Sequence, residues 1–127
     1  MVCAGLVLLV FSWAKNGNTV TSKKHQYSEL HYQNQWCFAQ NGNSKTLKDG
    51  TIADCVTNEF VVEVEFASKF YEAIGQSLHY GTQIERKPAI LLIIETPKDV
   101  IMRERLKAVI EKYSLPITVF SISPEEE

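Results

Sequence analysis

Two glutamates stand in a segment whose other residues are aliphatic, β-branched or aromatic. The segment runs from Phe60 to Phe66 (FVVEVEF), and its composition and alternation predict a β-strand. Glu63 and Glu65 are two residues apart, so both side chains point to the same face of that strand. Carboxylates in an apolar strand are costly unless a cation or hydrogen-bond donors meet them. The pair is therefore a candidate cation site.

Asp54 supplies a third carboxylate. It lies in the short run 52–56, and antiparallel pairing of that run with the strand 60–66 brings Asp54 near Glu63. Oxygen ligands from adjacent strands suit a hard ion, so these residues predict a Mg²⁺ or Mn²⁺ site. The sequence has no CxxC motif and no Cys/His cluster, so zinc has no obvious site.

A polar stripe follows this strand on the next predicted helix. At about 100° per residue, four polar side chains fall within an arc of about 80°: Lys69, Glu72, Gln76 and Tyr80. Lys69 comes just after the acidic strand and can reach back toward it. A solvated helix face produces the same stripe, and the helix alone favours that interpretation. The acidic strand before it favours a site.

The elements that position these residues follow from periodicity and turn signals. Apolar and aromatic spacing predicts a helix over 26–38, which ends before the turn residues 40–43. Asp49-Gly50 predicts a two-residue hairpin turn between strands over 45–48 and 51–57. After the strand 60–66, the period becomes helical over 67–80, and we expect Gly81 to end that helix.

The second half of the chain predicts a strand, a helix and a strand. Residues 88–95 are almost continuously apolar, which is typical of a strand buried on both faces. The helix is expected over 98–113 and the last strand over 117–122. The core stripe of that helix should comprise Val100, Ile101, Leu106, Val109, Ile110 and Tyr113. The order α-β-β-β-α-β-α-β predicts an α/β domain with a mixed sheet, an antiparallel meander joined to a crossover unit.

The run Asp54-x8-Glu63-Val64-Glu65-x3-Lys69, followed by a Gln-x-x-x-Tyr motif over 76–80, resembles the PD-(D/E)XK nuclease superfamily. The likeness is closer to its recombination-nuclease branch, which carries this motif on the helix after the catalytic strand. It covers 29–122. The segment 54–80 is also similar to a group of small exported bacterial proteins of unknown role, which share a W-C and a D-C cysteine. The resemblance implies a restriction-endonuclease-like fold with an αβββαβ core, here with an additional αβ at the C-terminus.

The resemblance also implies roles for individual residues. Asp54 and Glu63 would be metal ligands, and Glu29 matches the helix acid that often completes the site. Gln76 and Tyr80 would position substrate phosphate or the attacking water.

The chain departs from the family at one position. The family's lysine is expected two residues after the acid, where this chain has Glu65. Lys69 is then the candidate for a lysine that has moved to the next helix. Glu65 is either an extra ligand or the mark of a domain that has lost catalysis.

Charge restricts the partners. The chain has 13 basic and 15 acidic residues, which excludes a generally basic polyanion binder. The expected function is metal-dependent hydrolysis of DNA, with weak, salt-sensitive binding or a small substrate. Four basic residues are candidates for backbone contacts: Lys45, Lys48, Arg86 and Lys87. One alternative is an inactive nuclease-fold module that binds a protein or envelope partner. Another is an ordinary secreted domain in which Glu63 and Glu65 pair with Lys69.

The first residues predict export. The uncharged run 4–14 has the length of a signal-peptide core and is too short to span a bilayer. Its alternative is a buried strand or helix. We expect a signal peptide over 1–14, a linker over 15–25, one nuclease-like domain over 26–123 and an acidic tail over 124–127. The mature protein should have no membrane span.

Cysteine usage agrees with export to the periplasm or the medium. If Cys3 leaves with the signal, Cys37 and Cys55 remain as an even pair. An even pair in an exported chain predicts a disulfide. The alternative is two reduced cysteines in the core of a cytosolic protein.

Overall fold

The structure is a computed structural model that describes residues 24–125. The expected signal peptide over 1–14, most of the expected linker, and Glu126 and Glu127 lie outside the described residues. Within the described part, no helix has the length and apolar character needed to cross a membrane.

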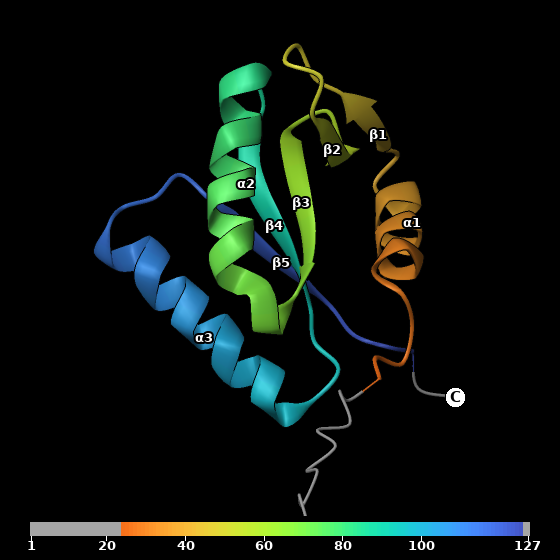
Figure 1. Cartoon of the computed structure of the whole chain (residues 1–127), viewed down its shortest axis with the longest axis vertical. Coiled ribbons are helices and arrows are strands. Elements are labelled where there is room, and N and C mark those ends of the chain that lie inside the picture. The colour runs from red at the N-terminus through yellow and green to blue at the C-terminus, as the bar shows by residue number, and fades with distance from the viewer. Residues whose placement is uncertain (1–23, 126–127) are drawn as a thin grey trace, which may run out of the picture.

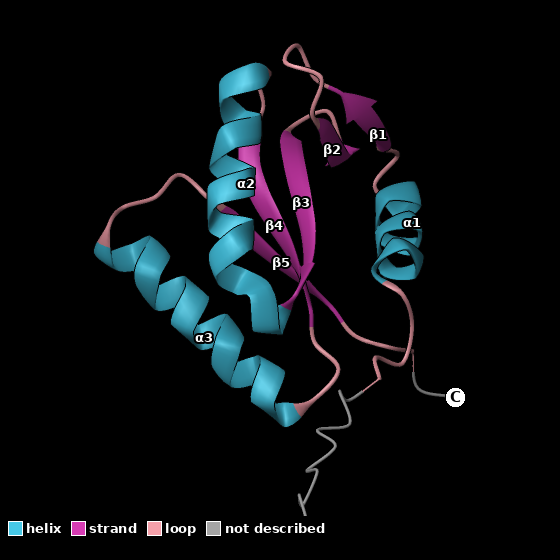
Figure 2. Cartoon of the chain, viewed as in Figure 1, coloured by secondary structure: helices cyan, strands magenta, loops and turns pink. Residues whose placement is uncertain are grey.

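Between residues 24 and 125, three helices and five strands form three layers. Helix α1 lies on one face of the sheet, and α2 and α3 lie on the other (Figure 1). A 3-10 turn at Ala67–Lys69 leads into α2. The elements, coloured by type in Figure 2, are α1 (Glu29–Ala39), β1 (Asn43–Thr46), β2 (Ile52–Val56), β3 (Phe60–Phe66), α2 (Phe70–Gln83), β4 (Lys87–Ile93), α3 (Pro97–Lys112) and β5 (Thr118–Ile122). The predicted α/β order is confirmed.

The strands lie in chain order in one mixed sheet. β2 is antiparallel to β1 and β3, whereas β3, β4 and β5 run parallel. In β4 the residues from Ala89 to Ile93 are all buried, because helices cover both faces of this strand. The predicted meander and crossover unit are both present.

Helix α1 covers one face of the sheet. Its first turn is capped by the Ser28 side chain, which accepts a hydrogen bond from the His31 amide at 3.2 Å. Asn41, with φ of 54°, follows the helix in the left-handed region. Tyr32 and Cys37 are the buried residues of the helix, and they pack in a core that includes Val62, Val64, Leu91 and Ile93.

Helix α2 covers the opposite face, and it begins and ends three residues later than predicted. Gly81 does not end it, because the helix continues to Gln83. A Cβ atom at Gly81 would lie 2.6 Å from Cγ of Pro88. The glycine therefore allows α2 to approach β4 closely, and the expectation that it is a helix stop is wrong.

Helix α3 packs on the same core through a narrower face than predicted. Leu106 is fully buried, and Met102 and Ile110 pack beside it at helical spacing. Val100 and Ile101 lie off this stripe and are exposed, as is Tyr113 beyond the last turn. The assignment of these three residues to the core is wrong.

The predicted disulfide is confirmed. Cys37 of α1 and Cys55 of β2 are bonded, and their Cα atoms are 5.8 Å apart. Both residues are buried. The bond joins the helix that carries Glu29 to the strand that carries Asp54.

Candidate functional site

Asp54 lies where β2 and β3 stop pairing. The ladder between the two strands joins Cys55 to Val62 and Val56 to Val61. Beyond this ladder, a side chain replaces the backbone as the hydrogen-bond acceptor: Asp54 Oδ2 accepts a hydrogen bond from the Val64 amide at 2.8 Å. A further hydrogen bond, from Gln33 Nε2 to the Asp54 carbonyl oxygen at 2.8 Å, ties this point to α1.

Glu63 and Glu65 are buried on β3. Their relative exposures are only 4% and 6%. The Glu63 carboxyl group lies beside the side chains of Asp54 and Tyr80, both of which shift its pKa. Among the described residues, Oε2 of Glu63 is buried and has no hydrogen-bond partner. The structure therefore brings Asp54 and Glu63 together, as the strand pairing predicted, and leaves one carboxylate oxygen unused.

A second pair of carboxyl groups lies beside the first. Glu29, at the start of α1, hydrogen-bonds through its side chain to Glu65. The charge of Asp54 acts on Glu29, and the charge of Glu65 acts on Glu63, so the two pairs form one electrostatic cluster. We call these four residues the carboxylate cluster: Glu29, Asp54, Glu63 and Glu65.

Burial is the main reason that the pKa values of the cluster are raised. It raises the pKa of Glu63 to about 9, with the charge of Asp54 adding to the effect. It also raises the pKa of Glu29 to about 7, assisted by the charge and hydrogen bond of Glu65. The pKa values of Asp54 and Glu65 are raised by burial as well, although the amides of Val64 and Phe66 partly oppose the shift.

These properties fit a hard divalent cation. The raised pKa values show that too little positive charge surrounds these clustered carboxyl groups. Carboxylate oxygens are the ligands that Mg²⁺ and Mn²⁺ prefer, and a bound ion would supply the positive charge. The unused Oε2 of Glu63 supplies a free donor atom. Over residues 24–125, no three His, Cys, Asp or Glu side chains are already arranged to hold a metal ion. An ion would therefore have to draw the two pairs together.

Lys69 lies near the Glu29 and Glu65 side chains of the cluster. It precedes α2, is exposed, and its charge acts to lower the pKa of both Glu29 and Glu65. Among residues 24–125, no ion pair joins Lys69 to Glu63 or Glu65. The ion pairs of Lys69 with the two strand glutamates, which the ordinary-domain alternative expected, are therefore not formed in the described part of the chain.

The polar stripe of α2 is not a uniform solvated face. Glu72 and Gln76 are exposed, but Tyr80 is only 6% exposed and packs with Leu47, Ala53 and Val61. Burial, together with the charge of Glu63, raises the pKa of Tyr80. Its hydroxyl group therefore stays protonated beside the Glu63 carboxyl group.

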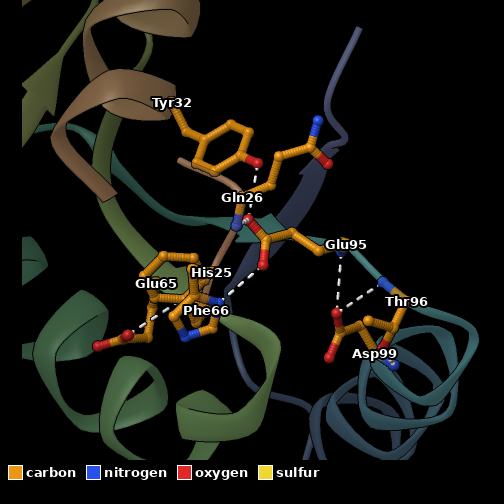
Figure 3. Close-up of polar contacts among 8 residues, drawn as sticks. All are labelled: His25, Gln26, Tyr32, Glu65, Phe66, Glu95, Thr96 and Asp99. Atoms are coloured by element: carbon orange, nitrogen blue, oxygen red, sulfur yellow. Dashed lines mark hydrogen bonds and ion pairs between the residues drawn. The ribbon is translucent and has the colours of Figure 1, made fainter. Parts of the chain in front are cut away.

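Glu95, two residues after the end of β4, makes the main polar contact that the sequence did not predict (Figure 3). Its carboxylate accepts from the Tyr32 hydroxyl at 2.8 Å and from the Gln26 amide at 2.9 Å. His25 Nδ1 lies 2.7 Å from its Oε2. Although burial alone would raise the pKa of Glu95, these hydrogen bonds lower it. Residues 25–32 are thereby fixed to the sheet, and Glu29 is in that segment.

The same contact explains why His25 belongs to the domain rather than to the expected linker. Its ring stacks on Phe66, with centroids 3.5 Å apart (Figure 3). Asp99 fixes the other side of the contact, because its Oδ2 accepts from the amides of Glu95 and Thr96, both at 2.9 Å. In the sequence, the one sign of this contact is that Glu95 directly follows an apolar run. That position does not identify the residues that Glu95 contacts.

Replacement of Glu95 by alanine should destabilise the protein by about 2 kcal/mol, because it leaves the fully buried Tyr32 hydroxyl without an acceptor. Urea unfolding measures the loss. In a Tyr32→Phe background the same replacement should cost less, and Glu85→Ala, at an exposed position, should cost almost nothing. Equal losses in both backgrounds would show that the hydrogen bond is unimportant.

Comparison of the chain with protein-family models, with curated proteins and with solved structures found no match. A function is therefore inferred from the geometry and chemistry of the carboxylate cluster and from the elements that carry it.

Proposed function

We propose that the protein is a Mg²⁺- or Mn²⁺-dependent nuclease that hydrolyses phosphodiester bonds in DNA. The observation that carries this proposal is the buried Glu63, with its unpartnered Oε2, beside Asp54 and next to the Glu29–Glu65 pair. Buried carboxylates that repel one another destabilise a fold. A bound cation would offset this repulsion, which explains why the fold keeps these carboxylates together.

The arrangement of the elements supports a restriction-endonuclease-like fold. Helix α1, strands β1 to β3, helix α2 and strand β4 follow the αβββαβ order of the PD-(D/E)XK core, and α3 with β5 forms the additional αβ. The carboxylates come from α1, β2 and β3, which are the elements where the family resemblance expects them. Assignment to this superfamily is part of the proposal.

Asp54, Glu63 and Glu29 would hold the metal, with Glu65 as a further ligand. A bound divalent ion supplies polarisation of the phosphate and a lower pKa for an attacking water. Asp54 is fixed for this purpose by the Val64 amide. The hydroxyl group of Tyr80, which lies close enough to Glu63 to shift its pKa, would orient the Glu63 carboxyl group.

Two further side chains would act on the substrate: Lys69, in the 3-10 turn before α2, and Gln76, in α2. Lys69 lies close enough to influence Glu29 and Glu65 electrostatically, so it would stabilise negative charge that develops on the phosphate. Gln76 is exposed on the same stretch of chain and would position a phosphate.

Weak, salt-sensitive binding is part of this proposal. Lys87 already pairs with Glu59 at 2.9 Å, and Arg86 donates to the Thr57 carbonyl oxygen at 3.0 Å. Both lie at the beginning of β4, beside Phe60, which is the end of β3 away from Glu65. Lys45 and Lys48 are exposed and remain the better candidates for backbone contacts.

A second candidate is a catalytically inactive module of the same fold that binds a protein or envelope partner. Glu65 favours it, because this residue occupies the position of the family's lysine and hydrogen-bonds to Glu29. The Cys37–Cys55 disulfide supports an exported protein under either proposal, since disulfides persist in oxidising compartments.

The test is cleavage of supercoiled plasmid and single-stranded DNA with Mg²⁺, Mn²⁺ or EDTA. We expect metal-dependent nicking that falls to background in Asp54→Ala and by about 100-fold in Lys69→Ala. Glu59→Gln, which removes an exposed carboxylate, should cleave normally. Metal binding measured by calorimetry, with no cleavage by the wild type, would favour the binding module. Absence of both cleavage and metal binding would overturn the metal site.

A further inference from the structure

A cavity of about 310 Å³ lies between α2 and the turn that connects β1 to β2. Gly75, Gln76, His79 and Tyr80 of α2 line it, together with Thr51. Tyr80 connects this cavity to the carboxylate cluster, because it lines the cavity and lies close enough to Glu63 for each group to shift the pKa of the other. A molecule in the cavity would therefore lie next to the cluster.

Gly75 is unexplained by the packing of the fold. It stands in the middle of α2, where glycine is the poorest helix former after proline. A Cβ atom at this position would meet no atom within 4 Å, so no neighbour requires its absence. Gly81, six residues later, is different, since its Cβ would collide with Pro88. The missing side chain at Gly75 leaves the helix backbone open to the cavity.

His79 is held in a fixed orientation in this cavity. Its Nε2 lies 2.6 Å from Oδ2 of Asp49. Asp49 is itself fixed, because its Oδ1 accepts from the Thr51 amide at 3.0 Å and from the Thr51 hydroxyl at 2.6 Å. These hydrogen bonds hold the pKa of Asp49 below its usual value. The contact with a carboxylate places a proton on Nε2, which leaves Nδ1 for another partner.

We propose that this cavity is a subsite for one nucleoside of the DNA substrate, adjacent to the phosphate that the carboxylate cluster would receive. This inference rests on the proposed nuclease function and names the part of the substrate that this neighbouring cavity holds.

The chemistry of the lining fits a nucleoside better than a phosphate. No lysine or arginine lines the cavity, and the Asp49 carboxylate lies 2.6 Å from the His79 ring, so the surroundings do not favour an anion. His79 presents a ring nitrogen, which suits the polar edge of a base. The open backbone at Gly75 allows a flat ring or sugar to lie against the helix. The volume is at the small end of ligand sites, which range over about 300–1,000 Å³.

The test uses binding that does not depend on cleavage. The probe is a fluorescein-labelled single-stranded DNA of about 12 nucleotides, titrated in EDTA and followed by anisotropy. We expect Gly75→Leu to weaken binding by about tenfold, and Gly75→Ala by less, because each fills the cavity. His79→Ala should also weaken binding. Both Gly75 variants should keep or raise Tm, since the replacements are better helix formers and meet no neighbouring atom.

Two controls separate the cavity from the fold. Thr82→Ala, at an exposed position on the same helix outside the cavity, should bind as the wild type does. Gly81→Ala should lower Tm, because its Cβ meets Pro88. Unchanged binding by Gly75→Leu with an unchanged Tm would overturn the subsite, as would failure of the wild type to bind the probe at all.

The outcomes also distinguish the subsite from the proposed function. If the wild type cleaves plasmid DNA but Gly75→Leu binds and cleaves as well as the wild type, the nuclease proposal stands and the subsite is wrong. If the wild type binds the probe without cleaving DNA, and Gly75→Leu loses that binding, the subsite stands and catalysis is wrong.

Discussion

Replacement of Glu63 by glutamine is expected to make the metal-free protein more stable at about pH 8, and to remove its stabilisation by Mg²⁺. Glutamine has the shape of the protonated glutamic acid and does not titrate. In the folded wild type, burial and the charge of Asp54 raise the pKa of Glu63 to about 9. The variant therefore avoids the cost of keeping this group protonated or of burying its charge.

The direction in which stability changes with pH follows from the direction of the pKa shift. A carboxyl group with a raised folded-state pKa binds more protons in the folded state, so stability is lost as pH rises from the unfolded value of 4.5 toward the folded value of about 9. Glu29, with a pKa raised to about 7, acts in the same direction. Asp49 and Glu95 act oppositely, because their pKa values are lowered and their contribution is lost on acidification. Metal-free protein should be most stable at weakly acidic pH.

The expected gain for Glu63→Gln at about pH 8 is on the order of 1–3 kcal/mol, and it should vanish below about pH 5. Urea unfolding at a series of pH values in EDTA measures it. With saturating Mg²⁺, the wild type should gain about 2–3 kcal/mol at about 100 times its dissociation constant, and the variant should gain nothing.

Glu59→Gln is the matched control, because Glu59 is an exposed carboxylate paired with Lys87. It should change stability by less than about 0.5 kcal/mol and keep the full response to Mg²⁺. A loss of stability in Glu63→Gln at high pH, or an unchanged response to Mg²⁺, would contradict the assignment of Glu63 as a ligand.

The sequence predicted elements best where one physical signal dominates. The alternation over 60–66 and the apolar run of β4 place both strands within two residues of their positions in the structure. Errors arose where one residue type serves two purposes. Gly81 reads as a helix end, but the structure uses it for close contact with Pro88. Val100 and Ile101 read as core, but α3 touches the sheet through Met102, Leu106 and Ile110.

The candidate site was predictable only in part, for a related reason. Asp54 and Glu63 come together through one hairpin, so pairing of neighbouring strands was enough to predict their contact. The position of Glu29 depends on how α1 lies across the sheet, and only the family resemblance suggested that it joins the site. Its contact with Glu65 depends on Glu95, which holds residues 25–32 in place although it lies 63 to 70 residues away in the sequence. No local pattern encodes such an arrangement.

Removal of the disulfide is the second large expected effect. Cys37 and Cys55 are 18 residues apart, so the double variant Cys37→Ala/Cys55→Ala should lose about 3 kcal/mol of unfolding free energy. Reduction of the wild type should have a similar effect. Because the bond joins α1 to β2, its loss should also loosen Glu29 relative to Asp54. Mg²⁺ affinity, measured by calorimetry on folded protein, should therefore fall.

Gly42 offers a control within the same structure. A Cβ atom there would lie 2.5 Å from Sγ of Cys55 and 3.0 Å from Sγ of Cys37. Gly42→Ala should therefore destabilise the oxidised protein. The same replacement should cost less in the Cys37→Ala/Cys55→Ala background, where two of the three nearest atoms are gone and the carbonyl oxygen of Val56, at 3.0 Å, remains.

The difference between the two costs measures the coupling of Gly42 to the bonded sulfur atoms. A positive difference means that the disulfide is formed and packs against Gly42 in solution. Equal costs, together with two reactive thiols in the untreated wild type, would mean that Cys37 and Cys55 are reduced. The constraint between α1 and β2 would then come only from packing and from the hydrogen bond of Gln33 to the Asp54 carbonyl oxygen.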